Sequence, residues 1–377
     1  MKNLKSWFKD QCIPRVVYIP FFIFKIFPIP FGVLNKSHKK LESNSSTSLC
    51  LEAGIHGWES IEFKELYQSA CEYLGDDSVD KVIINRDTCY VKQIKKVILE
   101  LQPTHYFYDP RTGSQKWYVG VWQAYRIAWL FHINGIIPVV LLTDLAIRSW
   151  RVQSGIVTAK RGCVISFVSS REVAPIFPHR RLISPSLMPL SEKTIEFLSD
   201  LFSQRPTTPS RKAIFTGSLY EPRTKILNEI KNKLSKDGYC LDIKGREMGG
   251  VRVSDLDYWK NLSHSLIVVT TADQLNSKNA DWCCIQHMIY RYLEVIASGS
   301  LLIAPDVPGL RRYFLADEHF VSFTTSEDAA QKIRYYLDNE DDRSRIAKQG
   351  KERAQALVAA RTFWLAIDVC LQSDSLT

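Results

Sequence analysis

The sequence of 377 residues predicts an α/β protein with two domains, and three observations lead to this fold class. Short apolar runs alternate with segments of helical periodicity along most of the chain. The runs are continuously apolar, which is typical of strands buried on both faces of a parallel sheet. The alternation stops at a stretch rich in proline and serine, residues 203–211, and then begins again.

The first half of the chain carries four strand-like runs separated by helical segments of the length found in βαβ units. Residues 91–101 and 118–134 have helical spacing, and Gly135 ends the second of these helices. The predicted strands are residues 80–85, 105–108, 137–144 and 163–170. Most of the tryptophans here, among them Trp122 and Trp129, are interpreted as core residues, and so is His132 on its apolar helical face.

The second half repeats the pattern and completes two Rossmann-like halves around the linker candidate 203–211. Thr325 and Asp328 resemble a capping box at the start of a helix, and Gly350 is expected to end a charged helix. A last apolar helix covers residues 362–372. The predicted strands are 213–216, 239–243, 266–270 and 300–304, and the other predicted helices are 222–236, 257–262, 282–298, 325–337 and 341–349.

Composition and charge exclude several classes of protein. Apolar residues make up 45% of the chain and charged residues 24%, which argues against a disordered, collagen-like or polytopic membrane protein. The nine cysteines form no C-x-x-C pair, so a zinc ribbon or a disulfide framework is not expected, and a reducing, cytoplasmic compartment is favoured. The net charge of +9 points to an anionic partner: a nucleotide, a phospholipid surface or a nucleic acid.

The amino-terminal segment, residues 1–48, is basic and hydrophobic and ends in a polar loop. Residues 16–34 have the length of a membrane span. Pro20, Pro28 and Lys25 disfavour a span, and no signal-peptide cleavage site follows. Three interpretations stay open: packing on the domain, peripheral docking on the inner face of a membrane, or a true span.

The first candidate site is the sequence FTGSLYEPR, which ends at Arg223. A strand leads into Gly217, where the backbone can approach a ligand closely, and Ser218 follows. Pro222 is suited to the first turn of a helix, whose free N–H groups favour anions. Arg223 could bind a phosphate through two hydrogen bonds. The alternative is an ordinary turn with a surface arginine.

The second candidate site is the sequence KGREMGG, residues 244–250. It also follows a strand and brings Lys244 and Arg246 together with three glycines, a pattern suited to phosphate or base recognition. A loop with solvated charges explains it equally well.

The third stretch, YRYLEVIASGSLLIAPDVPGL at residues 290–310, carries a resemblance to a known family. Glu294, Ala297, Gly299 and residues 301–304 match, in order and spacing, the sugar-nucleotide signature of group 1 (family-4-like) glycosyltransferases of the GT-B fold. The resemblance covers residues 210–355, whereas the first half agrees only in its α/β alternation. A helix-surface carboxylate paired with Arg291 is the alternative for Glu294.

The resemblance implies two domains that face a central cleft, with a carboxyl-terminal helix that returns to the first. Four parts are expected: residues 1–48, an acceptor domain 49–205, a nucleotide-sugar domain 206–355, and a return helix and tail 356–377. In the family the glutamate bonds ribose or sugar hydroxyls, and the glycine turn faces the diphosphate. These roles fall on Glu294, Ser298 and Gly299, beside Gly217, Ser218 and Arg223. Gln286 replaces the first glutamate of the family motif, and its amide can bind but carries no charge.

The predicted function is therefore a hexosyltransferase-type glycosyltransferase that moves a sugar from a nucleotide-diphosphate donor to a glycan or lipid-linked acceptor, as in polysaccharide biosynthesis. The resemblance implies retention of the anomeric configuration, with no metal and no cofactor besides the donor. The leaving diphosphate gains negative charge, which Arg223, Lys244 and Arg246 would stabilise. His56 and Asp144 are the candidate acid or base in the first half, although Asp144 also suits a helix N-cap.

Two other function classes stay open at this point. A catalytically silent GT-B-like nucleotide- or glycan-binding protein is consistent with Gln286 and with the unmatched first half. A nucleic-acid-binding protein ranks third, because no recognition motif is present and the basic residues are spread along the chain.

Overall fold

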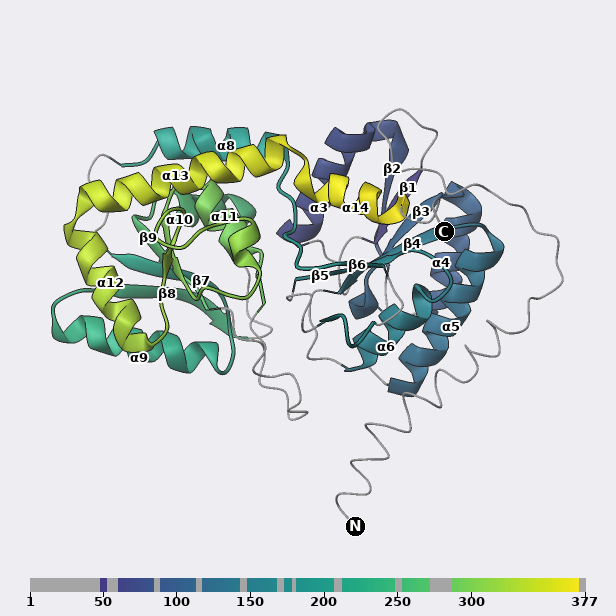
Figure 1. The fold of residues 1–377 in the computed structure, drawn as a ribbon, viewed down its shortest axis with the longest axis horizontal. Helices are drawn as coiled ribbons and strands as arrows, with labels where there is room; N and C mark the ends of the chain where they lie inside the picture. The colour runs from purple at the N-terminus through teal and green to yellow at the C-terminus, as the bar shows by residue number, and fades with distance from the viewer. Residues whose placement is uncertain are drawn as a thin grey trace, which may run out of the picture.

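The computed structural model describes residues 48–52, 60–84, 89–112, 117–142, 148–167, 173–177, 181–206, 212–247, 253–271 and 287–372. Two parallel sheets form two lobes with helices around them (Figure 1). The predicted α/β class with two Rossmann-like units is confirmed.

The first sheet has the strand order β2-β1-β3-β4-β5-β6, with every neighbouring pair parallel. The sequence analysis missed β1 and β6, because runs of four and three residues have no periodicity of their own. The strands are β1 (Leu49–Glu52), β2 (Val79–Val82), β3 (His105–Tyr108), β4 (Ile137–Leu142), β5 (Cys163–Ser166) and β6 (Arg181–Ile183).

Helices cover both faces of this sheet. One face and the outer layer α4 (Tyr90–Leu101), α5 (Trp117–Ile133) and α6 (Arg148–Val157) share one apolar core. The other face packs against α3 (Ile61–Leu74) and the last helix, α14 (Thr362–Gln372). Burial on both faces explains why the strands are continuously apolar.

The second sheet has the order β11-β10-β9-β7-β8 and is also parallel. Its strands are β7 (Ala213–Leu219), β8 (Leu241–Glu247), β9 (Ile267–Val269), β10 (Leu301–Ala304) and β11 (Val321–Ser322). Its helices are α8 (Glu192–Ser203), α9 (Arg223–Lys236), α10 (Asp255–Ser263), α11 (Arg291–Ala297), α12 (Ser326–Asp338) and α13 (Glu340–Ala359).

The chain crosses between the lobes earlier than the proline pattern predicts. In the second lobe, α8 lies beside α13 (Figure 1). Phe202 of α8 packs so closely on Gly299 that a Cβ on this glycine would lie 2.7 Å from the phenylalanine ring. The crossing is therefore the segment 184–191, upstream of the linker candidate 203–211, of which residues 207–211 lie outside the described residues. Proline and serine mark both segments as loops, but they do not indicate which loop connects two cores.

Two helix boundaries also differ from the prediction. Gly350 lies inside α13. A larger residue would not fit there, because a Cβ would lie only 2.4 Å from the backbone oxygen of His319. This glycine serves close packing and does not end the helix. The helix expected over 282–298 begins, within the described residues, at Arg291.

The return of the chain to the first lobe is confirmed. The last helix, α14, packs on β5 and β6 and reaches α3, where the indole N–H of Trp364 donates to Ser69 Oγ at 3.3 Å. Among the described helices, none alone is long and apolar enough to cross a membrane. The pair α13 and α14, bent by 40°, passes by length and composition only.

Candidate functional site

The candidate site lies at the carboxyl ends of β7 and β9, the edge where parallel sheets bind ligands. The strand β7 continues beyond Thr216 to Leu219, so Gly217 lies within the strand. Its φ of 142° is rarely adopted by other residues, and a Cβ there would lie 3.2 Å from Nη2 of Arg291. Glycine therefore lets an arginine from α11 approach the backbone of β7.

Arg223 is the first residue of α9 and turns back onto the same strand end. Its Nε donates to Thr271 Oγ1 at 3.1 Å, and its Nη1 donates to the Ser218 carbonyl at 3.0 Å. The guanidinium also stacks over the Tyr220 ring at 4.2 Å. These contacts fix a buried cation at the amino end of a helix, where the free N–H groups add positive potential.

Arg291 is the second cation at this edge and the first residue of α11. Its Nε lies 3.4 Å from Glu294 Oε2, one turn further along the helix, and its guanidinium lies 4.9 Å from the centre of the Tyr258 ring. Within the described part of the chain, the buried Nη1 of Arg291 has no hydrogen-bond partner. A buried donor of this kind is costly unless a ligand accepts from it.

Glu294 is buried beside this arginine and is not the surface carboxylate of the alternative interpretation. Burial raises its pKa to about 7, against the opposing effects of Arg291 and of a hydrogen bond from Tyr258. The carboxyl group is therefore poised between its neutral and ionised forms near neutral pH.

The first lobe borders the site through α3 and the segment that precedes α8. Lys64 of α3 forms an ion pair with Asp255 at the start of α10, and Glu62 raises the pKa of Glu294 by its charge. Tyr290, next to Arg291, donates to the Pro189 carbonyl at 3.1 Å. These contacts hold the two lobes together at the edge of the site.

A second polar cluster occupies the strand ends of the first sheet. Glu52 at the end of β1 accepts from the hydroxyl of Tyr106 at 2.9 Å and from the backbone N–H of Asp109 at 3.2 Å. Asp109 forms a buried ion pair with Arg111 at 2.8 Å. The polar groups of this cluster are hydrogen-bonded or paired with one another, so we assign it the structural role of fixing the strand ends.

The structure places Ser298 and Gly299 away from this edge, which corrects their predicted role. They follow α11 and precede β10, at the amino edge of the sheet. Gly299 packs against Phe202, and its carbonyl accepts from Arg205 at 3.4 Å. Their sequence is that of the glycine turn, but α11 separates them from the strand ends that hold Gly217.

The other predicted residues divide into two groups. Lys244 is exposed on β8 and donates to Asn261 Oδ1 at 2.7 Å, so the structure does not join it to Arg223. Arg246 lies on β8 beside Ser218, but its side chain is not described. Outside the described residues lie His56, Asp144 and Gln286.

Sequence reasoning missed three residues of the site: Tyr258, Thr271 and Arg291. Arg291 appeared only as a partner of Glu294, because the helix predicted over 282–298 concealed that α11 begins at this residue. Tyr258 and Thr271 had no local signal, because only the fold brings α10 and the end of β9 beside β7. In the described part of the chain, no group of three or more His, Cys, Asp or Glu residues could hold a metal ion.

Known proteins resemble this chain in sequence over one segment and in fold over most of its length. Residues 220–362 match the model of the glycosyl transferase-like family. HepE from Anabaena, solved with UDP and glucose, has 12% identity over 87% of this chain and 99% of its own, with a TM-score of 0.54. No curated protein matches the sequence significantly.

Two further solved structures share the fold. Sucrose-phosphate synthase from Thermosynechococcus elongatus has 14% identity over 87% of this chain and 98% of its own, with a TM-score of 0.54. A glycosyltransferase from Rickettsia africae has 11% identity over 88% of this chain and 97% of its own, with a TM-score of 0.51.

The two parallel-sheet lobes, together with these structural matches, define the GT-B fold. Residues 220–362 resemble the glycosyl transferase-like family, and the solved structures share the fold of the chain.

Proposed function

We propose that the protein transfers a sugar from a nucleotide-diphosphate donor to a hydroxyl of a glycan or lipid-linked acceptor, with the diphosphate bound between Arg223 and Arg291. Two guanidinium groups at the end of β7 carry this proposal: that of Arg291 lies against Gly217, and that of Arg223 donates to the carbonyl of the next residue, Ser218. The bound UDP and glucose of HepE support the class of donor.

The proposed reaction needs charge stabilisation at one place. The bond between the anomeric carbon and the diphosphate oxygen breaks, and its electron pair stays on that oxygen. The acceptor oxygen bonds to the same carbon, and its proton passes to the departing diphosphate, so that a nucleoside diphosphate leaves. Arg223 and Arg291 lie where the leaving group becomes more negative, and fixed cations in a buried site stabilise such a transition state. Glu294 in its ionised form would accept hydrogen bonds from ribose or sugar hydroxyls.

The finer features of the reaction belong to the proposal. Two cations provide the positive charge that a divalent metal often supplies to a leaving diphosphate, so we expect transfer to persist in EDTA. Retention of the anomeric configuration rests on the family resemblance. Proton NMR of the first product anomer tests it, and the inverted anomer would contradict it.

The experiment that tests the donor site is calorimetric titration of the full chain with UDP, ADP, GDP, CDP and dTDP. We expect one of them to bind, and Arg291→Gln and Arg223→Gln to weaken that binding by roughly tenfold to a hundredfold, because a hydrogen bond to a charged group contributes about 1.5–3 kcal/mol. Binding of none of the five nucleotides would contradict the proposal.

Two control variants make the test specific. Arg345→Gln removes an exposed arginine of α13 that pairs with Asp342, and it should leave nucleotide affinity unchanged. Lys244→Ala should weaken binding about twofold at most, since this ammonium contacts Asn261 at the exposed surface. Equal losses in Arg291→Gln and Arg345→Gln would show a general charge effect and would remove Arg291 from the site.

A further inference from the structure

The outer face of α5 exposes a stripe of large apolar side chains. Four of them follow one another at intervals of four, seven and four residues, which places them on one side of the helix. Their exposed fractions are 67% for Tyr118, 65% for Trp122, 40% for Trp129 and 46% for Ile133. This finding corrects the expectation that Trp122 and Trp129 belong to the core.

The helices beside the stripe are rich in basic residues. Helices α4, α5 and α6, with the turn that follows α6, contain a single acidic residue, Glu100. Lys92, Lys95 and Lys96 are exposed on α4, next to α5 in the same layer. Basic residues of this layer are Lys92, Lys95, Lys96, Arg126, Arg148, Arg151, Lys160 and Arg161.

An apolar hollow opens beside the carboxyl-terminal end of the stripe. Trp129, Pro138 and Val157 line it, with Lys160 and Arg161. The exposed His132 also lines it, which corrects its interpretation as a core residue. Arg161 donates to the Phe131 carbonyl at 2.9 Å, so its guanidinium is held in place at the edge of the hollow. An apolar wall with cations beside it suits a molecule that has an acidic head and a hydrocarbon chain.

We propose that the face formed by α4, α5 and the turn after α6 docks on an anionic lipid bilayer. Tryptophan and tyrosine are favoured at the interface between water and lipid, because the ring is apolar and one edge is polar. Lysine and arginine beside them are attracted to acidic headgroups. In Figure 1, α4 and α5 lie on the side of their lobe that faces away from the second lobe, so docking through these helices leaves the donor site uncovered.

The proposal is tested by co-sedimentation of the full chain with vesicles of neutral phosphatidylcholine, with and without 30% phosphatidylglycerol. We expect binding to the anionic vesicles, weakened in high salt because the attraction is screened. Trp122→Ala with Trp129→Ala, and separately Lys95→Glu with Lys96→Glu, should each reduce the partition coefficient about tenfold or more.

Matched controls come from the second lobe. Phe197→Ala replaces an aromatic residue with 37% exposure on α8, and Lys231→Glu with Lys236→Glu reverses two exposed charges on α9. Both controls should bind vesicles as the unaltered protein does. All variants should keep the melting temperature and the nucleotide affinity, which shows that they are folded.

Three outcomes would overturn the proposal. The first is that the unaltered protein does not bind anionic vesicles. The second is that the α4 and α5 variants bind them normally, which would assign membrane contact to residues 16–34. The third is normal vesicle binding with a lowered melting temperature in the tryptophan variant, which would show that the chain itself covers this face.

Discussion

At the level of single residues, the buried carboxyl group of Glu294 links the site to pH. Its pKa is about 7 in the folded protein, against an ordinary value of 4.5. Between these two values the folded protein binds more protons than the unfolded chain, so the free energy of unfolding falls as the pH rises from 4.5 to 7 and is level above. The full difference is about 3 kcal/mol.

Replacement of Glu294 by glutamine tests this effect. Glu294→Gln should remove the decrease in stability between pH 5 and pH 7, because the amide does not ionise. Urea unfolding at pH 5, 6, 7 and 8 measures it, with Glu196→Gln at an exposed position of α8 as the control. If the curves of the unaltered protein and Glu294→Gln run parallel over this range, the raised pKa is wrong.

Single residues also show how far a sequence motif can predict a site. Gly217, Arg223 and Glu294 were predicted from the sequence. In the structure Arg291 lies between Gly217 and Glu294, and Arg223 bonds to the residue after Gly217. Ser298 and Gly299 belong to the same motif, but they follow the last residue of α11, whereas Arg291 is its first. Seven residues with a rise of about 1.5 Å each place them some 10 Å along the helix axis from Arg291. A motif orders residues along the chain, and the intervening element decides which of them meet.

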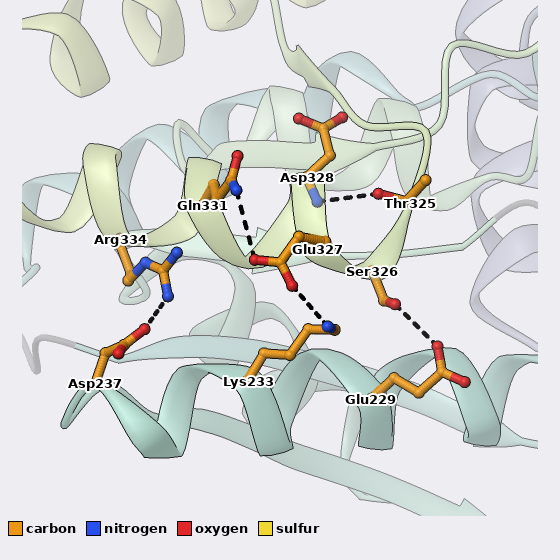
Figure 2. A network of polar contacts seen from close by, with 9 residues as sticks. All are labelled: Glu229, Lys233, Asp237, Thr325, Ser326, Glu327, Asp328, Gln331 and Arg334. Carbon is orange, nitrogen blue, oxygen red and sulfur yellow. Dashed lines mark hydrogen bonds and ion pairs between the residues drawn. The ribbon is translucent and has the colours of Figure 1, made fainter.

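At the level of elements, α9 and α12 pack side by side on one face of the second sheet and exchange polar contacts (Figure 2). Lys233 pairs with Glu327 at 2.6 Å, and Ser326 donates to Glu229 at 2.9 Å. Thr325 Oγ1 accepts from the backbone N–H of Asp328 at 3.1 Å, which confirms the predicted helix start and its cap, and the Asp328 carboxylate accepts from the N–H of Thr324 at 2.9 Å. The cap satisfies a helix N–H, whereas the ion pairs lie at the surface.

The cap and an ion pair of this network should differ in their effect on stability. Thr325→Ala leaves the N–H of Asp328 without its acceptor and should lower the free energy of unfolding by about 1 kcal/mol. Lys233→Ala breaks an exposed pair and should leave the urea midpoint nearly unchanged, because solvent and salt screen surface charges. A larger loss in Lys233→Ala than in Thr325→Ala would reverse this order.

Elements were predictable where their pattern is local. The helix cap at Thr325 and the strands β4 and β10 were found because apolar runs and caps are features of contiguous residues. The helix α5 is apolar on nearly every side, so its periodicity did not reveal that Trp122 faces outward. Only the packing of the layers decides which side of such a helix is covered.

At the level of the whole molecule, α14 connects the two lobes: it follows α13 of the second lobe in the chain, and it packs on the sheet of the first lobe. Trp364 is almost fully buried there, stacks against Tyr73 with ring centres 5.9 Å apart, and donates to Ser69. Asp368, one turn further along, accepts from the Tyr73 hydroxyl. The stability of the first lobe therefore depends on residues close to the carboxyl end of the chain.

Replacement of the Trp364 side chain should lower the free energy of unfolding of the first lobe. Trp364→Ala leaves a cavity in the core and should cost about 3–5 kcal/mol, whereas Leu365→Ala, at a position with 50% exposure in the same helix, should cost little. Urea unfolding followed by circular dichroism compares the two variants, and calorimetry with nucleotide reports on the second lobe. Equal midpoints for both variants would mean that α14 contributes no packing energy to the first lobe. Loss of nucleotide binding in Trp364→Ala at low urea would show instead that the donor site requires the docked helix.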